Sequence, residues 1–142
     1  MATNERHTGR LIDHIGLVVR DLAASKAFYS AVFGVLKIPM GSDGPDFFAD
    51  ELFFGARDGE LVQGQGTARI HIALQAQDRA MVDAFYQAAL AHGGRDNGTP
   101  GERAYHPGYY AAFVLDPDGN NIEAVFHGEA DRSAASVRIR YR

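Results

Sequence analysis

The chain contains an internal repeat, which restricts its fold more than its overall composition does. Residues 14–31, HIGLVVRDLAASKAFYSA, match residues 71–88, HIALQAQDRAMVDAFYQA, at nine of eighteen positions. Most of the shared residues are apolar, or are an aspartate suited to capping a helix. The leading histidines, His14 and His71, have no such explanation, because a strand begins with almost any residue. The repeat therefore predicts two similar units, each opening with a histidine.

Each unit is predicted to be a strand followed by a helix. In both strands the aliphatic residues alternate with the histidine and its neighbours, so the aliphatic face packs under the helix and the histidine faces the other way. The helices LAASKAFYSAVF and RAMVDAFYQAALAH follow, with Asp21 and Asp78 as their N-caps. Gly34 and Gly93–Gly94 are expected to end them. The Phe-Tyr pair in each helix is predicted to belong to the core.

Further strands are predicted after each helix. In the first half the signals are weak, at residues 35–40 (VLKIPM) and 51–57 (ELFFGAR), with a loop over residues 41–50 between them. In the second half YYAAFVL and NIEAVFH form a predicted hairpin around DPDG at residues 116–119, which is expected to be a turn and nothing more. Alternation along the last strand puts Glu123 on the same side as the two histidines.

Composition narrows the classes of partner. The net charge of −4 and the lack of a basic run argue against nucleic acid. No apolar run approaches the roughly 20 residues of a membrane span, and the first residues lack a signal-peptide core, so a cytoplasmic protein is expected. The sequence has no cysteine, which excludes disulfides and zinc-thiolate sites. A metal ion would have to be held by nitrogen and oxygen ligands.

Two imidazoles and one carboxylate are predicted to share the uncovered sheet faces. His14 and His71 open their strands, and Glu123 lies on the matching face of the last strand. Polar groups that project from separate strands onto an open face are typical of a metal or substrate site. These three residues are the candidate metal ligands.

Three segments, DHIGLVVRDLAASKAFY, HIAL and FVLDPDGNNIEAV, resemble the vicinal oxygen chelate superfamily. That superfamily groups glyoxalase I, extradiol dioxygenases, fosfomycin-resistance thiol transferases and bleomycin-resistance proteins. The resemblance spans residues 11–128 and implies an α+β fold, in which two βαβββ modules form a U-shaped, metal-lined cleft. Within one domain of residues 1–142, module 1 would cover about 11–57 and module 2 about 68–128, leaving a C-terminal tail of 129–142.

The resemblance also implies a ligand set. The family's metal positions fall on His14, His71 and Glu123, with the divalent ion open among Fe, Mn, Zn, Ni and Co. Glyoxalase I carries a fourth ligand, a carboxylate whose position falls near Phe53 in this chain. Glu51 shares the face of Phe53 but lies a strand step of almost 7 Å away. Two histidines and one carboxylate are the set associated with non-haem iron oxygenases, and the missing fourth ligand disfavours the glyoxalase reaction.

Other side chains are candidates for roles around the metal. His106, in a loop entering a strand, is either an acid-base group or a surface histidine. Tyr109 would donate to a substrate oxygen if the hairpin register pairs Phe113 with Glu123, and Tyr110 would replace it if the register slips by one. His127 lies about 7 Å along the strand from Glu123, so at most it is expected to support the metal ligands rather than to bind the ion itself.

The expected function is that of a metal-dependent enzyme, lyase- or isomerase-like, acting on a small substrate with vicinal oxygens, in which Glu123, Tyr109 and His106 take the catalytic roles. An extradiol-type ring-cleaving dioxygenase and a metal-free drug-binding protein are the alternatives. A thiol transferase acting on fosfomycin would need a cationic pocket, and no Lys/Arg cluster is assigned to the open face. A homodimer is expected, with the site inside one chain or, as we favour, shared between two.

Overall fold

The computed structural model describes residues 5–8, 14–56, 70–129 and 137–140. The elements in chain order are β1 Glu5–Thr8, β2 Ile15–Val19, α1 Leu22–Leu36, β3 Gly41–Asp43, β4 Asp46–Ala49, β5 Leu52–Ala56, β6 His71–Gln75, α2 Arg79–Ala91, β7 Arg95–Glu102, β8 Tyr110–Leu115, β9 Asn121–Phe126 and β10 Val137–Arg140. The segment RDGELVQGQGTA, residues 57–68, which the sequence predicts to link the two modules, lies outside the described residues, as does part of the tail.

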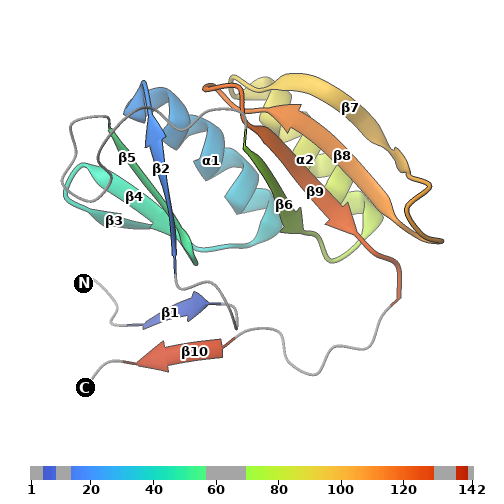
Figure 1. Ribbon diagram of the computed structural model, residues 1–142, viewed down its shortest axis with the longest axis horizontal. Helices are drawn as coiled ribbons and strands as arrows, with labels where there is room; N and C mark the ends of the chain where they lie inside the picture. The colour runs from blue at the N-terminus through green and yellow to red at the C-terminus, as the bar shows by residue number, and fades with distance from the viewer. Residues whose placement is uncertain (1–4, 9–13, 57–69, 130–136, 141–142) are drawn as a thin grey trace.

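Two four-stranded sheets with the same topology make up the body of the molecule (Figure 1). Their strand orders are β2-β5-β4-β3 and β6-β9-β8-β7. In each sheet the strand that comes first in the chain, β2 or β6, pairs in parallel with the strand that comes last in its module, β5 or β9. The other pairs are antiparallel. This is the predicted α+β fold of two βαβββ modules. Strands β1 and β10 form a separate two-stranded sheet near the chain ends.

The two helices contact each other and unite the modules around one core (Figure 1). Phe28 and Tyr29 of α1 are buried, as are Phe85 and Tyr86 of α2, as predicted for the Phe-Tyr pairs. Each helix also covers its own sheet with aliphatic strand residues, which the alternation in the sequence predicted. Leu17 and Val19 of β2 and Ile122 and Ala124 of β9 are among those that join this core.

The predicted N-caps are confirmed, whereas one predicted helix end is wrong. Asp21 accepts a hydrogen bond from the Ala24 amide at 3.0 Å, and Asp78 accepts one from the Met81 amide at 2.7 Å. Helix α1 does not end at Gly34 but continues to Leu36, because the Leu36 side chain is buried in the core. Lys37 then ends it in the left-handed conformation, with φ 59°.

The strand predictions failed at two places. Residues 35–40 form no strand, while the predicted loop at 41–50 contains the hairpin of β3 and β4. That hairpin forms because Gly44 supplies the positive φ of the turn and Phe47 stacks in the core on Phe54, with ring centroids 4.5 Å apart. Strand β7 was missed, because RDNGTPGE has the glycine and proline content of a loop.

The turn at residues 116–119 does more than reverse the chain. The Tyr29 hydroxyl of α1 donates to Asp116 Oδ2 at 2.6 Å, and both groups are buried. Arg20, which follows β2, forms an ion pair with Asp118 at 3.2 Å. The prediction that this segment is only a turn is therefore wrong, since its carboxylates bind module 1 to module 2.

We expect Tyr29→Phe to lower the free energy of unfolding by about 2 kcal/mol, because a buried carboxylate then loses a charge-assisted hydrogen bond. Urea unfolding monitored by circular dichroism measures the loss. The matched control is Tyr86→Phe, since Tyr86 is the repeat equivalent of Tyr29 and its hydroxyl bonds to Asp96 within module 2. A loss no larger in Tyr29→Phe than in Tyr86→Phe would contradict the bridging role.

Candidate metal centre

The sheet registers show which residues of the two modules are equivalent. Gly16 of β2 lies opposite Phe53 of β5, and Ala73 of β6 lies opposite Glu123 of β9. Gly16 and Ala73 each stand two residues after the repeat histidine. Phe53 is therefore the module 1 equivalent of Glu123, and it is also the residue near which the resemblance puts the fourth ligand of glyoxalase I.

His71 and Glu123 meet on the open face of module 2. The His71 Nε2 atom lies 3.0 Å from Glu123 Oε2. The Glu123 side chain is 3% exposed, whereas that of His71 is 48% exposed. On its other side, His71 Nδ1 lies 3.0 Å from the carbonyl oxygen of Asn121. A carbonyl only accepts, so Nδ1 carries a hydrogen and Nε2 is the atom presented to the carboxylate.

Tyr109 holds the second oxygen of Glu123. Its hydroxyl donates to Glu123 Oε1, in the hairpin register that places Phe113 opposite Glu123. Burial, this hydrogen bond and the negative charge of Glu123 raise the pKa of Tyr109 to about 12. Tyr110 points elsewhere, and its hydroxyl donates to Asp83 of α2 at 2.7 Å. Of the two tyrosines considered from sequence, the structure thus brings Tyr109 to the site.

His106 and His127 form a hydrogen-bonded pair beside Tyr109. His106 Nε2 lies 2.9 Å from His127 Nδ1, and His106 Nδ1 lies 2.9 Å from the Pro107 carbonyl oxygen. The ring centroids are 5.2 Å apart and the ring planes differ by only 15°, so the rings lie edge to edge with the nitrogens in line. The Tyr109 ring contacts both rings edge-on, and its centroid lies 5.3 Å from that of His106 and 5.1 Å from that of His127. Sequence reasoning undervalued His127, because its partner comes from a loop.

His14 stands apart, on the open face of module 1. Its ring contacts Phe53 edge-on at 5.5 Å, and Phe53 stacks on Phe48 at 5.1 Å. Within one chain, the described residues contain no group of three His, Asp or Glu side chains able to hold a metal ion. The structure therefore brings His71 and Glu123 together but does not bring His14 to them.

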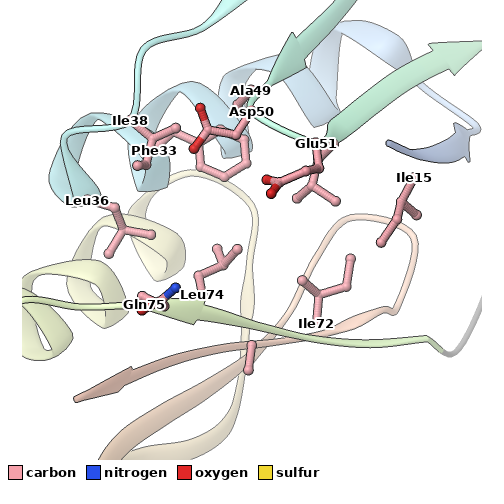
Figure 2. Close-up of a pocket in the computed structure, with 12 residues that line it drawn as sticks. Ile15, Phe33, Leu36, Ile38, Ala49, Asp50, Glu51, Ile72, Leu74 and Gln75 are labelled. Atoms are coloured by element: carbon pink, nitrogen blue, oxygen red, sulfur yellow. The ribbon is translucent and has the colours of Figure 1, made fainter. Parts of the chain in front are cut away.

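Glu51 lies in the turn that precedes β5, directly after Asp50, which has φ 48°. It lines a pocket of about 270 Å³ between the modules, opposite Ile72 and Leu74 of β6 (Figure 2). The turn redirects its side chain, so Glu51 does not continue the face of Phe53 as an extended strand would. Figure 2 shows its carboxylate directed into this largely apolar pocket.

Arg103 is a second residue that sequence reasoning missed. Its guanidinium lies 5.4 Å from the centre of the Phe113 ring, and that ring lies 6.1 Å from the His71 ring. A cation therefore stands on the open face beside His71 and Glu123. The only sequence signal was its position after the glycines of β7, which does not indicate where a long side chain points.

A family model for the Glyoxalase/Bleomycin resistance protein/Dioxygenase superfamily matches residues 11–124. The chain belongs to this superfamily. A glyoxalase/bleomycin resistance protein from Albidiferax ferrireducens T118 is similar in structure, with a TM-score of 0.68 and 32% identity over 82% of this chain and 98% of that one. Lactoylglutathione lyase from Agrobacterium tumefaciens shares the fold at 23% identity and a TM-score of 0.59, over 80% of this chain and 91% of the lyase. Comparison with curated proteins gives no match. Neither described helix has the length and apolarity to cross a membrane.

We expect Glu123→Gln to lower the pKa of Tyr109 from about 12 while leaving it above 10, because the charge disappears but the burial remains. Tyrosine ionisation followed by ultraviolet absorbance in chelator-treated protein measures this shift, and Tyr109→Phe identifies the transition. Asp83→Asn is the control, since it acts on Tyr110 instead. An unchanged Tyr109 transition in Glu123→Gln would contradict the hydrogen bond to Glu123.

Proposed function

We propose that the protein is a divalent-metal-dependent enzyme, lyase- or isomerase-like, whose small substrate carries two neighbouring oxygen atoms. The observation that supports this most directly is the distance of 3.0 Å between His71 Nε2 and Glu123 Oε2. Two ligands that bind one ion at about 2.1 Å and at right angles stand about 3 Å apart. The pair is therefore spaced as adjacent ligands of one metal ion.

The groups behind these two side chains also suit metal binding. The Asn121 carbonyl fixes the His71 tautomer with Nε2 facing Glu123, which is the usual support for a ligating histidine. Tyr109 fixes the other carboxylate oxygen and leaves Oε2 toward His71. The Asn121 carbonyl thus holds the candidate nitrogen ligand in place, and the Tyr109 hydroxyl holds the candidate oxygen ligand, before any ion binds.

We propose that His14 of a second copy supplies the third ligand in a homodimer. In the described part of the chain, β2 and β6 are each the end strand of a sheet; His14 directly precedes β2, and His71 is the first residue of β6. These edges carry apolar side chains open to water. Ile15 is 39% exposed, and it lines the pocket of Figure 2 together with the partly exposed Ile72 and Leu74. Pairing two copies along these edges would cover apolar surface.

A bound divalent ion would chelate the two substrate oxygens and stabilise negative charge that develops when a proton leaves the neighbouring carbon. Tyr109, with a pKa of about 12, stays protonated at neutral pH and remains a hydrogen-bond donor at the site. The imidazoles of His106 and His127 lie beside it, with His106 Nε2 2.9 Å from His127 Nδ1, and serve as the acid-base groups that accept or return a proton.

Ring cleavage of a catechol is the second candidate function. It is favoured by Phe53 at the position equivalent to Glu123, which leaves two histidines and one carboxylate, the set used by non-haem iron oxygenases. The same substitution disfavours the lactoylglutathione lyase reaction. Oxygen uptake on catechols by iron-loaded protein, compared with turnover of hydroxy-ketone isomers by protein loaded with manganese, nickel or zinc, separates the two candidates.

We expect His71→Ala and Glu123→Gln to abolish the metal content of protein purified without chelator, because each removes one of two adjacent ligands. Mass spectrometry of the metal, normalised to protein, makes the measurement. His92→Ala is the matched control, since His92 bonds to the Ala88 carbonyl at the end of α2, as expected for a helix-end histidine. Wild-type levels of metal in His71→Ala would rule out the proposed centre.

We expect a mixture of His14→Ala and Glu123→Ala proteins to recover part of the metal content and activity that each lacks alone. In a shared site, one half of the mixed dimer combines His14 of one chain with His71 and Glu123 of the other. Light scattering tests for the dimer, and exchange of a fluorescent label verifies that subunits mix. Verified exchange without recovery would place each site within one chain, and a monomer would remove the dimer altogether.

A further inference from the structure

We propose that Arg103 is the anion-binding residue of this site and that the substrate carries a carboxylate besides its two vicinal oxygens. This inference rests on the proposed function, which it extends by naming a class of substrate. Three independent features of the structure support it: the position of the guanidinium, the backbone groups that hold it, and the lack of an acidic partner among the described residues.

The guanidinium lies on the same face as the candidate ligands. It covers the Phe113 ring at 5.4 Å, and Phe113 stands directly opposite Glu123 in the hairpin of β8 and β9. The same ring lies 6.1 Å from the His71 ring. Phe113 thus lies between the cation and the His71–Glu123 pair, so a small molecule that extends past the edge of this ring would reach both.

Backbone groups of β7 hold the guanidinium in place. Thr99 accepts a hydrogen bond from Arg103 Nη2 at 2.7 Å through its carbonyl oxygen. A Cβ atom at Gly98 would lie 3.3 Å from Nη2, and one at Gly101 would lie 3.1 Å from Nη1. Side chains at these two positions would crowd the guanidinium, so the glycines leave the space it occupies. The side chain is held in one place rather than spread into solvent.

Arg103 differs from Arg20 and Arg79 in having no acidic partner among the described residues. Arg20 pairs with Asp118 at 3.2 Å and Arg79 pairs with Glu102 at 2.6 Å. Among the described residues no carboxylate pairs with Arg103, whose side-chain donors are used by the carbonyls of Thr99 and Glu102. Two such bonds leave three of the five guanidinium N–H groups for a ligand. The positive charge is thus held by two carbonyl groups and, within the described residues, has no ion-pair partner.

The chemistry favours a carboxylate over a phosphonate or phosphate ester. One guanidinium carries one positive charge, and its planar fork matches the two oxygens of a carboxylate. A doubly charged phosphoryl group would be only half neutralised and would lie near the negative charge of Glu123. Arg103 therefore fits a monoanionic carboxylate at one end of the substrate, with the vicinal oxygens at the other.

Hydroxamates test the proposal, because they chelate a metal through two neighbouring oxygens. The probes are acetohydroxamate, dicarboxylic acid monohydroxamates with two to four methylene groups, and their methyl esters, each titrated by calorimetry into metal-loaded protein. We expect the best free acid to bind roughly tenfold to a hundredfold more tightly than its ester. Arg103→Met should erase that difference and leave the affinity for acetohydroxamate and the metal content unchanged.

Two further variants separate binding from a structural role of the side chain. Arg95→Met removes the same charge from the opposite end of β7 and should retain the full preference for the free acid. Arg103→Lys keeps the charge without the fork and should retain part of it. If the preference for the free acid survives in Arg103→Met, or if it is lost equally in Arg95→Met, Arg103 is not the anion-binding residue.

Nuclear magnetic resonance of metal-free protein tests anion binding by Arg103 independently of the metal. Monomethyl succinate should shift the Nε–H signal of Arg103 and leave that of Arg95 in place, and methylphosphonate should act more weakly. No shift, or a larger response to methylphosphonate, overturns the carboxylate assignment. If acetohydroxamate fails to bind wild-type protein while the Arg103 signal responds to monomethyl succinate, the metal-dependent function fails and the anion site stands.

Discussion

The hydrogen bond between Tyr29 and Asp116 fixes one module against the other, and the position of the candidate site depends on it. Asp116 uses both oxygens, accepting from the Tyr29 hydroxyl and the Asn120 side chain through Oδ2 and from two turn amides through Oδ1. Burial and the neighbouring carboxylate raise the pKa of Tyr29 well above its ordinary value, so the donor keeps its proton. The turn that holds Asp116 leads directly into β9, which carries Glu123. Helix α1 of module 1 is thereby tied to the turn that precedes β9.

The two copies of the repeat have the same backbone but different surfaces on their open faces. Module 1 presents His14 beside Phe53 and Phe48, whereas module 2 presents His71 beside Glu123 and Phe113. Module 1 therefore offers one candidate ligand against an aromatic wall, and module 2 offers two ligands with their supporting groups. Among the described residues neither module alone brings three candidate ligands together, so the centre that we propose draws on both modules and on two copies of the chain.

The sequence predicted those parts of the fold that follow from periodicity, and it failed where a single backbone or side-chain position decides. Alternation identified the strand faces of His71 and Glu123, and the aspartates identified both helix starts. Alternation does not report the glycine-rich β7 or the β3–β4 hairpin, because bulges and turns interrupt its period. Arg103 was missed, and the partner of His127 was not identified, for a related reason. Arg103 bonds to the Thr99 carbonyl and His127 contacts His106, and these partners lie in irregular segments that leave no periodic trace in the sequence.

The contact between His71 and Glu123 is the feature on which the proposed metal centre depends. The Asn121 carbonyl lies beside His71 Nδ1, and the Tyr109 hydroxyl donates to Glu123 Oε1, so Nε2 and Oε2 are the two atoms left facing each other, 3.0 Å apart. The Glu123 side chain is almost fully buried, and a buried carboxylate is costly unless its oxygens have partners. His71 and Tyr109 supply one partner to each oxygen, so the same two contacts that stabilise the carboxylate also fix the direction in which it would meet a divalent ion.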